Sequence, residues 1–346
     1  MIYFYVYPSA FQNVGGGEIL LVKTKEFLEK KGIKIHLFDQ WNHRFQKGDL
    51  LHVFGSVKEA LGLMQIAKSK GVTIVHTPIV WYNWQSSIFI PYPSNERFLC
   101  IMRQTAKTFF PFVPSERKKM MSLADVVLAS SKAEAEQIVR YFLIPREKIR
   151  VVVCGADQNY ETGNGDIFTQ KFGLKNFVLT VGRIEPRKNQ LNLIRAMKTI
   201  KHALVIIGET VSHHQAYYEK CRKESGDNVF FFGGFPPDSE HLRSAYIACD
   251  TFALPTWFET PGIATLEAGL SGAKIVITRE GATKEYFKDL AEYVNPNSVT
   301  DIRAKITKTL NQPKNEALGK LIKERYLWQN TAEQTIAAYE AVGYRF

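Results

Sequence analysis

Two glutamates with a spacing of eight residues, Glu259 and Glu267, flank a segment expected to begin as a loop and continue as a helix. The amides of Gly262 and Ile263 would open that helix, where unpaired N–H groups and the helix dipole favour a phosphate. A carboxylate repels a bound anion. Two carboxylates beside an anion site therefore make sense only if they accept hydrogen bonds from neutral hydroxyls. A sugar and a ribose carry such hydroxyls, so the segment predicts a sugar-phosphate site, although helices often carry glutamates for solubility alone.

A second candidate is the stretch Gly182–Asn189, which follows an expected strand and contains three basic residues. Arg183 and Lys188 are close enough in sequence to hold one phosphate from a strand end and a helix start. Pro186 suits the first turn of a helix. A solvated basic surface has the same composition and remains the alternative.

A third candidate is the glycine run Gly15–Gly17, where missing side chains let the backbone approach an anion closely. It departs from a dinucleotide-binding fingerprint, because Leu20 occupies the third glycine position and a long loop separates the run from the preceding strand. Asp39 is placed like the ribose-binding acid of such folds. A nicotinamide site and an ordinary loop therefore both stay open here.

The elements that must position these residues are short apolar runs alternating with amphipathic stretches. This alternation predicts parallel sheets, hence an α/β protein with two doubly wound domains that bind ligands beyond the carboxyl ends of their strands. The expected strands are residues 2–7, 33–38, 50–54, 73–76, 126–129 and 150–154, then 177–181, 203–207, 229–232, 251–254 and 275–277.

The length of 346 residues suits two domains. The polar, glycine-containing stretch 157–176 predicts the boundary, with an N-terminal domain of residues 1–160 and a C-terminal domain of residues 161–327. The helical stretch 328–346 is expected to pack back on the first domain. Four cysteines without metal-ligand spacing predict no metal site and a reducing cytoplasm. The first residues lack a signal-peptide pattern, and no run is long enough to span a bilayer.

The formal charge of +11 is uneven, because residues 1–160 hold 21 Lys and Arg against 13 Asp and Glu, and residues 161–346 hold 24 against 21. Residues 97–119 contain six basic residues and one acidic residue among aromatic side chains. Such a composition suits an anionic membrane surface, although the aromatics could instead fill a core. The expected membrane or acceptor contacts are Arg103, Lys107, Phe109, Phe110, Arg117, Lys118 and Lys119.

Taken together in this order, these residues resemble glycosyltransferase family 4 and its relatives of the GT-B fold, in which two Rossmann-like domains face each other across a cleft. The resemblance extends over nearly the whole chain. It rests on Gly15–Gly17 and residues 124–131, 148–155, 181–188, 207–209, 232–233, 255–259 and 266–268, with Trp328 and Tyr339.

The resemblance implies a retaining, metal-independent enzyme without a cofactor. Such an enzyme would move a hexose-type sugar from a nucleotide-diphosphate donor to a lipid-linked or glycan acceptor in cell-surface polysaccharide or O-antigen synthesis. The implied location is cytoplasmic, peripheral on the inner face of the cytoplasmic membrane. The first domain would bind the acceptor and the second the donor.

The resemblance also implies residue roles. Arg183 and Lys188 would hold the donor diphosphate and neutralise the charge of the leaving group. Glu259 would accept hydrogen bonds from the donor sugar, and Glu267 from the ribose. The donor site would be completed by Gly16, Gly17, Gly182, Glu209, Gly262 and Ile263, with His76 near the sugar or in a structural role. Pro261 departs from the family pattern and removes one N–H from the phosphate site.

Two other function classes stay open. A nucleotide-sugar epimerase or nicotinamide-dependent oxidoreductase could use the same architecture, but the broken glycine fingerprint disfavours the oxidoreductase and the paired glutamates disfavour the epimerase. A non-catalytic binder of polyanions such as RNA would account for the charge. Because no RNA-binding motif accompanies it, nucleic acid is not an expected partner.

Overall fold

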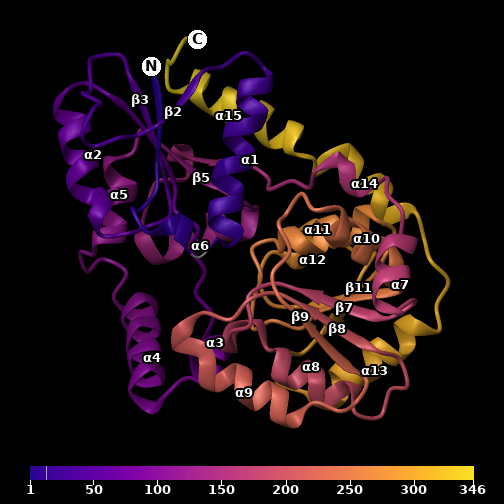
Figure 1. Cartoon of the computed structure of the whole chain (residues 1–346). Helices are drawn as coiled ribbons and strands as arrows, with labels where there is room; N and C mark the ends of the chain where they lie inside the picture. Colours follow the sequence, from indigo (N-terminus) through magenta and orange to yellow (C-terminus); the bar gives the residue numbers. More distant parts are fainter. Residues whose placement is uncertain (13) are drawn as a thin grey trace. The chain divides into compact units, whose positions relative to one another are not determined.

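The computed structural model describes residues 1–12 and 14–346, which divide into two compact units (Figure 1). Unit 1 comprises residues 1–82, 102–155 and 328–346, and unit 2 comprises residues 83–101 and 156–327. Each unit is built around a parallel β-sheet that has six strands among the residues described. The predicted α/β class with two doubly wound sheets is confirmed.

The sheet of unit 1 has the strand order β2-β1-β3-β4-β5-β6, with every pair parallel. The chain passes from β1 to one neighbour and then returns to the other, so the direction of winding switches between β1 and β3. The strands are β1 Ile2–Tyr5, β2 Ile35–Leu37, β3 Leu50–Phe54, β4 Thr73–Thr77, β5 Val126–Ala129 and β6 Ile149–Val151.

Helices cover both faces of this sheet, which explains its continuous apolar strands. On one side, Val53, Ile74 and Val127 are fully buried in a core shared with α2 and α6. On the other, α1 packs against the C-terminal helix α15. The helices of unit 1 are α1 Gly16–Lys30, α2 Glu59–Ser69, α5 Glu116–Leu123, α6 Lys132–Phe142 and α15 Trp328–Ala341, with short 3₁₀ turns η1 Ala10–Gln12 and η2 Arg146–Lys148.

The sheet of unit 2 has the strand order β12-β11-β10-β7-β8-β9, again parallel. Its switch point lies between β7 and β10, where ligands of doubly wound sheets commonly bind. The strands are β7 Val178–Val181, β8 Leu204–Ile207, β9 Val229–Phe232, β10 Thr251–Leu254, β11 Lys274–Thr278 and β12 Glu292–Val294.

Strand residues Val178, Leu204 and Val276 belong to a fully buried core with α8 and α13. The helices of unit 2 are α3 Trp84–Phe89, α7 Asp166–Phe172, α8 Gln190–Met197, α9 Gln215–Glu224, α10 Glu240–Ala248, α11 Ile263–Leu270, α12 Thr283–Phe287, α13 Val299–Leu310 and α14 Ala317–Arg325, with 3₁₀ turns η3 Gln158–Tyr160, η4 Pro186–Lys188 and η5 Ser212–His214. Helix α4 Ser94–Phe109 continues from unit 2 into unit 1.

Residues 83–101 belong to unit 2, whereas the sequence-based division placed them in the first domain. Asn83 Nδ2 donates a 2.8 Å hydrogen bond to Glu280, and the Phe89 ring stacks on Trp257 at 6.3 Å between centroids. These partners are distant in sequence, so local periodicity carries no sign of them. The expected boundary stretch 157–176 also differs, since it contains α7, which packs against α10 in unit 2.

Candidate functional site

The loops that follow β7 and β8 approach each other too closely for a side chain. Gly208 has φ +154°, and a Cβ there would lie 2.1 Å from the carbonyl oxygen of Gly182. Gly182 has φ +146° and donates its amide to the carbonyl of Ile207 at 3.0 Å. The two glycines therefore set the close approach of the loops, from which Arg183 and Glu209 extend.

Turn η4 fastens the loop after β7 to the loop after β10. Asn189, which ends the turn with φ +60°, is buried, and its Nδ2 donates to the carbonyls of Pro255 at 2.8 Å and Pro296 at 2.9 Å. The amide of Trp257 in turn donates to the carbonyl of Arg187 at 3.0 Å. These bonds bring Lys188 next to Glu259.

Lys188 and Glu259 form a direct ion pair at the switch point, with 2.6 Å between Nζ and Oε1. The side chain of Glu259 is 8% exposed and that of Lys188 is 16% exposed, so water screens the pair poorly. Burial lowers the pKa of Lys188, and the adjacent Glu259 carboxylate opposes that shift. The pair thus supplies a cation and an acceptor at one point of the sheet edge.

The backbone of Glu259 is held by a short β-bridge to Gly281. Glu259 donates its amide to the carbonyl of Glu280 at 3.1 Å and accepts at 2.9 Å from the amide of Ala282. Gly281 has φ +108°, and a Cβ there would lie 2.0 Å from the Glu259 carbonyl oxygen. Glycine is therefore required at 281 for Glu259 to keep this position.

Gly262 caps α11 with φ +91°, so Ile263 begins the helix as predicted. Glu267 lies in the second turn of α11 and accepts a 2.8 Å hydrogen bond from the hydroxyl of Tyr246. Tyr246 is completely buried, and burial together with Glu267 raises its pKa. Sequence reasoning missed Tyr246, because a tyrosine in α10 carries no local sign of a partner in α11.

Eight of the predicted site residues therefore lie on loops or a helix start at the carboxyl ends of neighbouring strands of unit 2. Within this group Glu209 is exposed and extends past Gly234, where an added Cβ would come within 2.9 Å of its Cγ. The group consists of Gly182, Arg183, Lys188, Glu209, Glu259, Gly262, Ile263 and Glu267. Their roles remain predictions.

The other predicted donor contacts, Gly16, Gly17 and His76, belong to unit 1. Gly16 and Gly17 are the first two residues of α1. The preceding amide, that of Gly15, donates to the buried carboxylate of Glu18 at 2.8 Å, which also accepts from Tyr7 at 3.0 Å. An acidic group thus already occupies part of this helix start.

His76 is fully buried at the end of β4, and its Nε2 lies 3.0 Å from the carbonyl oxygen of Gly55. Its Nδ1 has no hydrogen-bond partner among the described residues. Burial lowers its pKa to about 4, and the hydrogen bond to Gly55 opposes that shift. The imidazole is therefore neutral at physiological pH.

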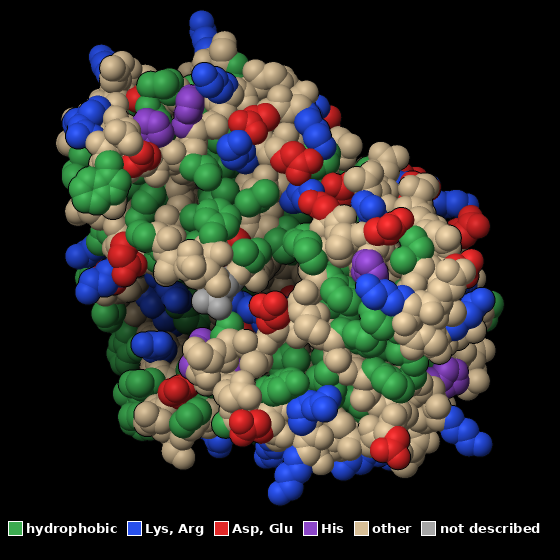
Figure 2. Space-filling model, in the orientation of Figure 1, with side chains coloured by type: hydrophobic (Ala, Val, Ile, Leu, Met, Phe, Trp, Pro, Cys, Tyr) green, Lys and Arg blue, Asp and Glu red, His purple; other side chains and the backbone are tan. Residues whose placement is uncertain are grey.

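The aromatic residues of the predicted membrane segment are exposed, which contradicts the alternative that they fill a core. Phe98, Met102 and Phe109 form an apolar stripe at helical spacing on α4, with 60%, 52% and 65% exposure. Phe110 and Phe112 continue it beyond the helix at 52% and 63% exposure. Figure 2 shows hydrophobic and basic side chains side by side where Figure 1 draws α4.

The basic residues of this segment differ in their contacts. Arg103 and Lys119 are exposed, whereas Lys107 donates to Ser115 at 3.0 Å and Arg117 donates to the hydroxyl of Tyr82 at 3.0 Å. Lys118 Nζ lies 3.4 Å from the carbonyl oxygen of Pro111. No helix in the described part of the chain combines the length and apolarity needed to cross a bilayer.

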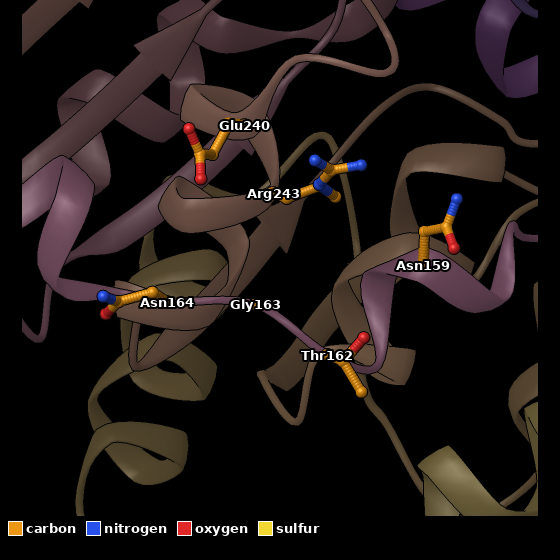
Figure 3. A pocket seen from close by; sticks show the side chains of 6 residues that line it. All are labelled: Asn159, Thr162, Gly163, Asn164, Glu240 and Arg243. Atoms are coloured by element: carbon orange, nitrogen blue, oxygen red, sulfur yellow. The ribbon is translucent and has the colours of Figure 1, made fainter.

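A separate hollow of about 300 Å³ lies beside η3 and α10 (Figure 3). Its lining includes none of the predicted site residues and is mainly polar. It is lined by Asn159, Thr162, Gly163, Asn164, Glu240 and Arg243. The hollow is therefore separate from the eight predicted site residues of unit 2.

Residues 166–328 match the family model described as glycosyl transferases group 1. The matched segment, 163 of the 346 residues, is similar to this family. The match covers the strands and loops that carry all eight predicted donor-site residues of unit 2.

Among curated relatives, the O-antigen chain mannosyltransferase B of Escherichia coli is 25% identical over 63% of this chain and 61% of its own length. The D-inositol 3-phosphate glycosyltransferase of Segniliparus rotundus is 27% identical over 64% of this chain and 54% of its own. The chain thus spans only 54% to 61% of these relatives.

Solved structures share the fold of this chain over nearly its whole length. A glycosyltransferase from Rickettsia africae superposes with a TM-score of 0.75 and 14% identity, covering 100% of this chain and 99% of that one. Anabaena Alr3699/HepE in complex with UDP and glucose gives a TM-score of 0.71 and 17% identity, covering 98% and 99%. The predicted GT-B fold is confirmed.

Proposed function

We propose that this protein is a retaining, metal-independent glycosyltransferase that moves a hexose-type sugar from a nucleotide-diphosphate donor to a lipid-linked or glycan acceptor in cell-surface polysaccharide or O-antigen synthesis. The observation that carries the proposal is the convergence of Arg183, Lys188, Glu259 and the start of α11 at the switch point of unit 2. Cations, a helix N-terminus and a carboxylate acceptor are the groups a sugar diphosphate requires.

The donor diphosphate would bind the cations Arg183 and Lys188 together with the amide of Ile263. Charge builds up on the diphosphate as the sugar–phosphate bond breaks, so groups already held in place there stabilise the transition state more than the ground state. Glu267, oriented by Tyr246, would accept from the ribose hydroxyls, and Glu259 from the sugar. No side chain is assigned as a nucleophile, since the acceptor would attack on the face that the leaving group vacates.

The names of the relatives support the substrate classes. One relative is named an O-antigen chain mannosyltransferase and another a serotype-specific mannosyltransferase, and one solved structure of the same fold holds UDP and glucose. We therefore propose a hexose donor and a glycan acceptor. The first experiment is to identify the nucleotide of the donor.

The exposed stripe of α4 with its basic neighbours supports an acceptor that resides in a membrane. Phe109 and Phe110 would enter the headgroup level of an anionic bilayer while Arg103 and Lys119 contact lipid phosphates. Each basic residue near such a surface contributes on the order of 1 kcal/mol. We propose peripheral attachment to the inner face of the cytoplasmic membrane.

The reaction is tested by incubating the purified protein with a panel of nucleotide sugars and measuring the released nucleoside diphosphate. We expect release from at least one donor, undiminished by a chelator such as EDTA. Proton NMR of the product with a simple glycan acceptor should show the anomeric configuration of the donor. Interconversion of the sugar while it stays on the nucleotide would instead indicate an epimerase.

A further inference from the structure

The guanidinium of Arg187 contacts two carboxylates at this sheet edge, those of Glu185 and Glu259. Its Nη2 lies 3.0 Å from Oε1 of Glu185, and its Nε donates to the same oxygen at 3.1 Å. Its Nη1 lies 3.6 Å from Oε1 of Glu259. Burial opposes the charge, but Glu259 and Glu185 together raise the pKa of Arg187 above its ordinary value.

The same carboxylates also pair with the two cations predicted to bind phosphate. Lys188 lies 2.6 Å from Glu259, and Nε of Arg183 lies 3.6 Å from Oε2 of Glu185. The charges therefore alternate along one chain of contacts, with three cations and two carboxylates. Arg187 is its middle member.

This arrangement creates a competition when a diphosphate arrives. The phosphates attract Arg183 and Lys188 away from Glu185 and Glu259, whose side chains are 10% and 8% exposed. A buried carboxylate left without a cation is strongly destabilised. A third cation that pairs with both carboxylates removes that obstacle.

Arg187 and Lys188 are neighbours in η4, and both reach Oε1 of Glu259, with Nη1 of Arg187 at 3.6 Å and Nζ of Lys188 at 2.6 Å. The guanidinium of Arg187 lies 5.3 Å from the ring centroid of Phe258, with Nη1 3.4 Å from the Phe258 carbonyl oxygen. These contacts fix the arginine independently of any ligand.

We propose that Arg187 is a positioning residue that keeps Glu185 and Glu259 neutralised while Arg183 and Lys188 bind the donor diphosphate. The inference rests on the proposed function, since it assigns a role within the same site. Arg187 itself does not touch the donor. Its presence determines how readily the two phosphate-binding cations exchange carboxylate for phosphate.

The test is calorimetric titration with UDP, GDP and dTDP. For the diphosphate that binds the wild type, we expect Arg187→Gln to weaken affinity about tenfold, which corresponds to ~1.4 kcal/mol. Adding Glu185→Gln should restore most of the loss, because one competing carboxylate is gone. Arg187→Lys, which keeps the charge but cannot bridge both carboxylates, should fall between the two.

The matched control is Arg195→Gln, which breaks a bidentate ion pair to Glu224 elsewhere in unit 2, with both N–O distances 2.7 Å. It should leave affinity unchanged even where it lowers the melting temperature. The inference alone is overturned if a folded Arg187→Gln binds the diphosphate with wild-type affinity. It is also overturned if adding Glu185→Gln restores none of the lost affinity. If Arg187→Gln does not fold, wild-type affinity in Arg187→Lys overturns it equally. Failure of the wild type to bind any nucleoside diphosphate overturns the proposed function as well.

Discussion

The Nζ atom of Lys188 lies 2.6 Å from Oε1 of Glu259, although 71 positions separate the two residues in the chain. The contact arises because β7 and β10 are neighbours in the sheet and the loops that follow them are tied together through Asn189. A cation and an acceptor from distant segments thus meet where a doubly wound sheet binds its ligand.

Tyr246→Phe tests the orientation of Glu267. Removing the hydroxyl leaves the Glu267 carboxylate without its 2.8 Å donor from α10, so we expect the KM for the donor to rise about fivefold with a smaller change in kcat. Steady-state kinetics with varied donor measure this. Tyr218→Phe on α9 is the control, and an unchanged donor KM in Tyr246→Phe would reject the role of the hydrogen bond.

Gly281→Ala tests how the Glu259 loop is held. The new Cβ would collide with the Glu259 carbonyl, so we expect a loss in the free energy of unfolding of about 3 kcal/mol, together with loss of turnover. Gly272→Ala is the control, since Gly272 has φ +81° but no atom within 4 Å of an added Cβ. It should cost about 1 kcal/mol from backbone conformation alone. Equal losses measured by urea unfolding would contradict the steric account.

Strands with fully buried faces were predictable, because an apolar run bounded by polar residues is itself the signal. The expected strand 50–54 coincides with β3, and 126–129 with β5. The places of Gly182 and Gly262 in the fold were predictable too, since Gly182 follows strand β7 and Gly262 caps helix α11 as expected.

Contacts between distant segments were not predictable. The hydrogen bond from Asn83 to Glu280 joins residues that are 197 positions apart. No local pattern in residues 83–101 shows to which of the two domains they belong. Tyr246 and Arg187 were missed for the same reason. Their partners in the site, Glu267 and Glu259, lie on other elements, and their own segments follow ordinary helix and turn patterns.

The exposed stripe of α4 predicts binding to anionic membranes. In sedimentation with liposomes, we expect the wild type to bind vesicles containing anionic lipid, and Lys118→Glu/Lys119→Glu to lose most of that binding by charge reversal. Phe109→Ser/Phe110→Ser should weaken it through lost apolar insertion. The control is Lys220→Glu/Lys223→Glu on α9, which changes the charge equally. Equal sedimentation of all four proteins would exclude docking through this segment.

The buried His76 of β4 predicts that the free energy of unfolding decreases in acid. His76 has an ordinary pKa of 6.5 in the unfolded chain and about 4 in the folded protein, so unfolding takes up a proton between these values. The free energy of unfolding should therefore fall as pH drops from about 6.5 to 4, by up to ~1.4 kcal/mol per pH unit from this group. His76→Gln should reduce that slope in urea unfolding, whereas His202→Gln at an exposed site should not. An unaltered slope would contradict the assignment.

The central claim is that the sheet edge of unit 2 binds the diphosphate of a nucleotide donor. The most direct measurement is the melting temperature of the wild type, Lys188→Ala and Glu267→Ala with and without UDP, GDP or dTDP. A ligand at 100 times its Kd stabilises a protein by ~2.7 kcal/mol, so we expect a clear rise in the wild type with at least one diphosphate and little or none in either variant. The account is contradicted if none of the three stabilises the wild type, or if Lys188→Ala responds as the wild type does.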